Sequence, residues 1–98
     1  MRRAAKVDAN QAAIVDALRK CGCSVLSLAA IGKGAPDLLI GLRGKNVLAE
    51  VKNPATRGKL NDLQNDWHTK WAGQVLTVTS PEDALRQLDL WGKEGLTG

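Results

Sequence analysis

The chain contains no phenylalanine and no tyrosine, and three tryptophans are its only large aromatic residues. Leucine, isoleucine, valine and alanine must therefore fill most of a hydrophobic core. Hydrophobic residues still make up 44% of the 98 positions, which favours a folded chain over a disordered one. No apolar run reaches membrane-spanning length, and the basic N-terminus lacks the apolar stretch of a signal peptide. We expect one domain over residues 1–98, without a membrane partner.

Cysteine is also scarce, because Cys21 and Cys23 are the only two. They lie too close together in the chain to reach disulfide geometry easily. A zinc site would need two further ligands, and the single histidine, His68, is far away in sequence. We interpret the pair as buried thiols in a reducing compartment, and therefore expect a cytoplasmic protein.

Acidic residues are outnumbered, with 10 Asp and Glu against 14 Lys and Arg and a formal charge of +4. This balance is compatible with a polyanionic partner and equally with simple solubility. The candidate phosphate contacts are basic residues near the chain start and in two loops: Arg2, Arg3, Lys6, Lys33, Arg57 and Lys59. Each of them is otherwise a solvated surface charge. We expect the 1–6 arm and the glycine-rich 92–98 tail to be flexible.

Hydrophobic spacing and turn residues predict the order helix, strand, strand, strand, helix, strand, helix. The helices are expected near 8–20, 60–72 and from 80 onwards, and the strands near 23–31, 37–43, 46–52 and 74–79. The last strand follows a crossover helix, so it can lie parallel to its predecessor. The predicted fold class is α/β, a small mixed β-sheet flanked by helices.

The second predicted helix carries four large apolar residues on one face, namely Leu60, Leu63, Trp67 and Trp71. This spacing is typical of a buried stripe, and we interpret both tryptophans as core residues rather than base-stacking platforms. Gln64 falls within the same stripe, where a buried amide needs hydrogen-bonding partners. His68 falls off the stripe and is predicted at the surface.

The most informative pattern is a predicted hairpin that carries Asp37 on one strand and Glu50 and Lys52 on the other. A two-residue type II′ turn at Gly44-Lys45 would pair Asp37 with Lys52 and leave Asp37 and Glu50 as diagonal neighbours. Because side chains alternate along a strand, all three charges project to one face. The other, inward face is predicted to carry Leu38, Ile40, Leu42, Val47, Ala49 and Val51. Diagonal neighbours lie about 7–8 Å apart, near enough for both carboxylates to reach one cation.

Two carboxylates on adjacent strands suit Mg²⁺ or Mn²⁺, which prefer oxygen ligands. A cation there would activate water and offset negative charge on a scissile phosphate. Lys52, beside it, would position the attacking water or stabilise charge in the transition state. The alternative interpretation is an ordinary salt-bridged strand end.

Three further features carry a resemblance to a known family. Gly34-Ala35-Pro36-Asp37, Glu50-Val51-Lys52 and the downstream Gln64 resemble the PD-(D/E)XK nuclease superfamily, and within it the chain is similar to the stand-alone VRR-NUC domains found mostly in phages. Asp8-Ala9-Asn10-Gln11 and Trp71-Ala72-Gly73-Gln74-Val75 also look like small phage members, so the likeness covers nearly all of the chain.

The resemblance implies a restriction-endonuclease-like core and Mg²⁺-dependent hydrolysis of phosphodiester bonds in DNA, often branched or flapped. Mn²⁺ is expected to substitute for Mg²⁺, and no small-molecule organic cofactor is expected. The resemblance also implies a homodimer located in the bacterial cytoplasm, or in the host cell for a phage protein. By the same resemblance Asp37, Glu50 and the backbone carbonyl of Val51 are the metal ligands, Lys52 is the catalytic lysine and Gln64 supports the site.

In one respect the chain departs from the family pattern. Many members place a glutamate on the first helix facing the metal, whereas here no glutamate precedes Glu50. Asp8 or Gln11 is the expected substitute. The missing glutamate keeps two other hypotheses open: a basic DNA-binding module with a degenerate nuclease site, and an interaction domain whose strand-end acids only form salt bridges.

Overall fold

The computed structural model describes residues 2–56 and 59–97, with side chains described for residues 9–55 and 59–89. The elements follow in the order α1 (Arg2–Lys20), β1 (Ser24–Ser27), β2 (Leu38–Leu42), β3 (Lys45–Val51), the 3₁₀ turn η1 (Pro54–Thr56), α2 (Asp62–Lys70), β4 (Val75–Val78) and α3 (Pro81–Thr97). The predicted α/β class and the predicted order of helices and strands are confirmed. In the described parts of the chain, no helix has the length and apolar character needed to cross a bilayer.

The four strands form one mixed sheet in the order β1-β2-β3-β4. The strands β1 and β2 are antiparallel, as are β2 and β3, whereas β4 pairs with β3 in parallel. The connection between these two strands crosses over through α2, as the sequence predicts. The parallel pair matters for the site, because it brings the C-terminal ends of β3 and β4 together.

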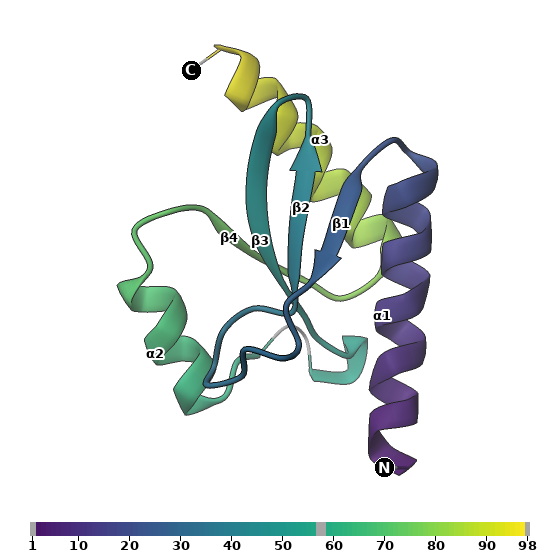
Figure 1. Ribbon diagram of the computed structural model, residues 1–98, viewed down its shortest axis with the longest axis vertical. Helices are drawn as coiled ribbons and strands as arrows, with labels where there is room; N and C mark the ends of the chain where they lie inside the picture. The colour runs from purple at the N-terminus through teal and green to yellow at the C-terminus, as the bar shows by residue number, and fades with distance from the viewer. Residues whose placement is uncertain (1, 57–58, 98) are drawn as a thin grey trace.

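The core lies between one face of the sheet and the helices α1 and α3 (Figure 1). Its buried members are all aliphatic apart from one cysteine: Ile14, Leu18, Cys23, Leu38, Ile40, Val47, Ala49, Val51, Val78, Ala84 and Leu88. The inward face predicted for the hairpin is therefore confirmed. Among the described side chains, no aromatic ring contributes to this core.

The helix α2 differs from the other two, because none of its residues is buried. It stands apart from α1 and α3, on the other side of the sheet (Figure 1). The buried stripe predicted for it is wrong: Leu63 is 57% exposed, Trp71 is 46% exposed and Trp67 is only half-buried. The physical reason is that α1 and α3 already cover the apolar face of the sheet, so α2 has no core to enter.

Several element boundaries also differ from the predicted ones. The helix α1 begins at Arg2 and includes most of the expected flexible arm, and α3 continues to Thr97 through most of the expected flexible tail. The first strand has four residues instead of nine. Cys21 is exposed, contrary to expectation, because α1 ends before it; Cys23 is buried, and burial raises the pKa of its thiol.

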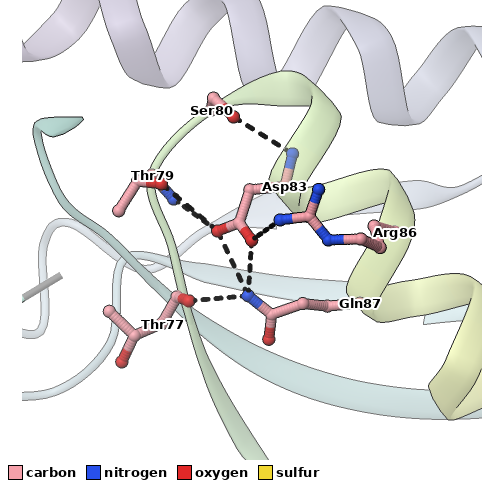
Figure 2. A network of polar contacts seen from close by, with 6 residues as sticks. All are labelled: Thr77, Thr79, Ser80, Asp83, Arg86 and Gln87. Atoms are coloured by element: carbon pink, nitrogen blue, oxygen red, sulfur yellow. Dashed lines mark hydrogen bonds and ion pairs between the residues drawn. The ribbon is translucent and has the colours of Figure 1, made fainter. Parts of the chain in front are cut away.

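A polar network fixes the connection between β4 and α3 (Figure 2). Ser80 caps α3 by accepting the N–H of Asp83, as predicted. The Asp83 carboxylate accepts the N–H of Thr79 at 2.9 Å and the amide of Gln87, and it pairs with Arg86 at 2.8 Å. Burial alone would raise the pKa of Asp83, but these hydrogen bonds and the guanidinium outweigh it and hold the pKa below its usual value. The end of β4 is therefore held in place.

Candidate functional site

The β2–β3 hairpin turns one residue earlier than predicted. Arg43 and Gly44 both have positive φ angles, 54° and 77°, and connect Leu42 directly to its partner Lys45. Positive φ at both central residues defines a type I′ turn, whose twist matches that of paired strands, so the predicted type II′ turn is wrong. The register moves by two positions, and a shift of two leaves every side chain on its predicted face.

This register change brings the two acidic residues closer than expected. The strands pair Leu38 with Ala49, and one step further the same register sets Asp37 opposite Glu50 rather than diagonal to it. Asp37 is held from both sides: its Oδ2 accepts the N–H of Val51 at 2.8 Å, and its carbonyl accepts the N–H of Leu28 at 2.7 Å. The two carboxyl groups therefore face one another at the strand end.

Glu50 is the most unusual side chain of the site. It is only 3% exposed, and its Oε2 accepts a hydrogen bond from Nε2 of Gln64 at 2.8 Å. Its Oε1 is buried and has no hydrogen-bond partner among the described residues. Burial, the negative charge of Asp37 and a hydrogen bond that the protonated carboxyl can share with Asp37 raise the pKa of Glu50 to about 8, although Lys52 opposes the shift. Without a cation, Glu50 is therefore largely protonated at neutral pH.

Gln64 joins the site to the start of α2. Its backbone N–H donates to Oδ1 of Asn61 at 2.9 Å, and its own Oε1 accepts the N–H of Asn61 at 3.1 Å, a capping box. The remaining amide nitrogen is the group that donates to Glu50. The predicted position of Gln64 beside the carboxylates is confirmed, and both ends of its amide have the partners that the sequence requires.

Lys52 directly follows β3, and its N–H donates to the carbonyl of Val78 on β4 at 2.9 Å. Its positive charge is near enough to lower the pKa values of Glu50 and His68. The backbone carbonyl of Lys52 accepts a hydrogen bond from Nδ2 of Asn10 at 3.1 Å, and the same nitrogen contacts the carbonyl of Thr79 at 3.3 Å. One side chain of α1 thus bridges the ends of β3 and β4.

The sequence interpretation missed this role of Asn10. The available signal was its spacing, since Asn10 lies four residues before Ile14 and eight before Leu18, the two residues of α1 that are fully buried. A polar residue in line with a buried stripe needs a polar partner inside the protein. Here the partners are the two strand-end carbonyls.

His68 was also misplaced by the sequence interpretation. It lies four residues after Gln64 on α2, and therefore on the same helix face. His68 is half-buried, and its Nε2 is buried without a hydrogen-bond partner among the described side chains, so the predicted surface position is only partly correct. Burial, and then the charge of Lys52, lower the pKa of His68, which favours the neutral imidazole. The spacing from Gln64 was the signal that could have placed it here.

The carboxylate expected from the first helix has no clear replacement. Gln11 lines a hollow of about 460 Å³ formed only by residues of α1, among them Asp16 and Arg19. The side chain of Asp8 lies outside the described residues. Within the described ranges, no three His, Cys, Asp or Glu side chains gather as a cation-binding group. The described acidic site is therefore a pair, Asp37 and Glu50.

These two carboxyl groups fit a hard divalent cation. Their donor atoms are oxygens, one of which, Oε1 of Glu50, is buried and unpartnered, and a cation would relieve the repulsion that raises the pKa of Glu50. A role of the Val51 carbonyl as a further ligand stays a prediction. Beside the pair, a cleft of about 250 Å³ is lined by Asp37 and Gln64 and by part of the connector before β2.

The predicted phosphate contacts are described only in part. Lys33 and Lys59 are exposed. Arg57 lies outside the described residues, as do the side chains of Arg2, Arg3 and Lys6 in α1. Their contact with DNA stays a prediction.

Comparison of the chain with protein-family models, with curated protein sequences and with solved structures finds no match in any of the three. The function is therefore argued from the motifs of the chain and from the geometry of the site.

Proposed function

We propose that the chain is a Mg²⁺-dependent DNA endonuclease that hydrolyses phosphodiester bonds, with a restriction-endonuclease-like core of the VRR-NUC type and a preference for branched or flapped DNA. The observation that carries the proposal is the buried Glu50, which faces Asp37, keeps one oxygen unpartnered and lies near Lys52. A salt-bridged strand end would not leave a buried carboxylate oxygen without a partner.

In this proposal Asp37 and Glu50 hold the Mg²⁺, together with the carbonyl of Val51. When bound, the cation supplies positive charge that offsets the charge developing on the scissile phosphate. Gln64 fixes Oε2 of Glu50 and so leaves Oε1 as the oxygen available for binding. Lys52 positions the attacking water or stabilises the negative charge of the transition state.

A chain of 98 residues offers little surface to hold a branched duplex. The proposal therefore includes a two-fold homodimer, which would present two sites to the two arms of one DNA molecule. Sedimentation analysis of the purified protein would measure its mass directly.

The main test is cleavage of linear, flapped, forked and four-way DNA in the presence of Mg²⁺ or Mn²⁺. We expect the parent protein to cut branched substrates, and the variants Asp37→Asn, Glu50→Gln and Lys52→Met to be slower by about 100-fold or more. Lys20→Met is the matched control, because Lys20 is an exposed lysine paired with Asp16 on α1, and its variant should cleave at the parental rate. Parental activity in the Lys52→Met protein would overturn the mechanism.

A second candidate function is a basic DNA-binding module with a degenerate nuclease site. The lack of a glutamate before Glu50 in the sequence favours it. Thermal melting separates the two: an intact site gains about 2.7 kcal/mol at a Mn²⁺ concentration of 100 times Kd, enough to raise the melting temperature by roughly 10–20 °C. We expect this rise in the parent protein and not in Asp37→Asn. Unchanged melting in both proteins, with DNA binding retained, would favour the binding module.

A further inference from the structure

The helix α2 exposes an aromatic and apolar surface, which we call the tryptophan face and define as Leu63, Trp67 and Trp71. The two indole rings stack on one another, with centroids 4.6 Å apart and planes inclined by 17°. Leu63 and Trp71 are among the large hydrophobic residues that are most exposed in the described chain. Because the core is built without aromatic rings, these tryptophans do not serve to fill it.

The tryptophan face adjoins the proposed metal site. Leu63 immediately precedes Gln64, which donates to Glu50, and both residues line the same cleft as Asp37. Gly73 helps to hold the outer tryptophan in place, since a Cβ atom there would lie 2.9 Å from Nε1 of Trp71. A ligand on this helix would therefore be held beside the two carboxylates.

The size of the face argues against a second copy of the chain as its occupant. A large aromatic side chain buries about 150–250 Å² at most. With Trp71 about half exposed and Trp67 half-buried, the face offers on the order of 300 Å² including Leu63, well below the roughly 800 Å² per partner of a stable interface. Flat stacked rings on a chain of net charge +4, with exposed lysines at positions 59 and 70 near the two ends of the helix, the second of them paired with Asp66, instead suit a polyanion that carries aromatic bases.

We propose that the tryptophan face binds unpaired bases of single-stranded DNA by stacking on Trp71, and so selects substrates with a single-stranded segment next to the cut. This inference rests on the proposed nuclease function and deepens it, because it names the part of a flapped or forked substrate that the protein recognises. Stacking is tolerant of base identity, so no sequence preference is expected from this surface.

Fluorescence anisotropy in EDTA tests binding without cleavage, with a labelled 15-nucleotide thymidine strand and a blunt duplex as probes. We expect Trp71→Ala to weaken single-strand binding about tenfold with little effect on the duplex, and Trp71→Phe, which keeps a ring, to stay within about threefold of the parent. Leu26→Ala is the matched control, because Leu26 is an equally exposed apolar residue on β1, and should not change binding. The salt dependence should be the same in Trp71→Ala as in the parent, since no phosphate contact is lost.

Equal losses on both probes, or no loss on either, would overturn the inference, and so would a parent protein that binds no single strand. A parental dimer that dissociates in Trp71→Ala, measured by light scattering, would assign the face to a second copy instead.

Quenching of the parental tryptophan fluorescence by the thymidine strand supports stacking without any variant. A protein that binds in this way but cuts nothing with Mg²⁺ keeps the inference and refutes the nuclease, whereas a nuclease whose single-strand binding ignores Trp71 refutes the inference alone.

Discussion

At the scale of single residues, Glu50 combines burial, a facing carboxyl group and an oxygen without a partner. Such an arrangement costs folding free energy whenever the group is ionised and no cation is present. In a structural salt bridge, an ion pair would offset this cost. Lys52 lies close to Glu50 but forms no ion pair with it among the described contacts. The proposed cation would offset this cost.

The raised pKa of Glu50 predicts how the stability of the metal-free protein depends on pH. The folded-state pKa of about 8 lies above the ordinary value of 4.5, so the protonated form is favoured by folding. The stability that protonated Glu50 contributes is complete below about pH 4.5, and it is lost as the pH rises from there through 8. At about 1.4 kcal/mol per pKa unit, the loss reaches several kcal/mol. Urea unfolding in EDTA across this range measures it. Glu50→Gln, which does not titrate, should remove this part of the pH dependence, and an unchanged profile in that variant would contradict the assignment.

Residue types and spacing were enough to predict Asp37, Glu50 and Lys52 as one cluster, and the resemblance to the nuclease family added Gln64. Alternation along the two strands fixes their face, and that rule survives a two-residue error in register. Asn10 and His68 were missed because their environment depends on which helix covers which end of the sheet. The local sequence around either residue does not indicate which helix covers which end of the sheet.

At the scale of elements, the connector before β2 is held against α2 at one point. Gly34 has a φ of +84°, and a Cβ atom there would lie 2.8 Å from the carbonyl oxygen of Leu63. The close neighbour of Gly34 is therefore the backbone of α2. This contact sets the side of the cleft opposite Asp37.

Replacement of this glycine should destabilise the protein more than replacement of a neighbouring one. Gly34→Ala combines an unfavourable positive φ with a backbone clash, and we expect a loss of about 2–4 kcal/mol. Gly32→Ala is the matched control, because Gly32 also has a positive φ, +66°, but nothing lies within 4 Å of its added Cβ, so about 1–2 kcal/mol should be lost. Equal free energies of unfolding for the two variants in urea would show that the contact with α2 is not close.

Turn chemistry explains why the hairpin was predicted in the right place but in the wrong register. A glycine at either position of a two-residue loop is compatible with a tight turn, and the sequence places Gly44 between Arg43 and Lys45. The choice of Arg43-Gly44 requires a positive φ at an arginine, which sequence propensity disfavours. Pairing along the full length of both strands outweighs that local cost.

At the scale of the whole molecule, Asn10 connects α1 to the ends of β3 and β4 through two carbonyl groups. Asn10→Ala should lower the free energy of unfolding by about 1–3 kcal/mol, because two part-buried carbonyls lose their donor. The matched control is Gln11→Ala, on the same helix and facing a hollow of α1, which should change it by less than about 0.5 kcal/mol. If urea unfolding gives both variants the parental stability, the bridge does not contribute to the fold.

The order of the elements, the inward face of the β2–β3 hairpin and the residue types that suit a cation all follow from the sequence alone. Periodicity and turn residues act over a few positions, so they are readable along the chain. Tertiary packing fixes the rest: Asp37 faces Glu50 directly, Asn10 bridges the ends of β3 and β4, His68 lies near the charge of Lys52, and Trp71 stays exposed at the end of α2. These features depend on the space left after α1 and α3 cover the sheet, and packing between distant segments is what fixes that space.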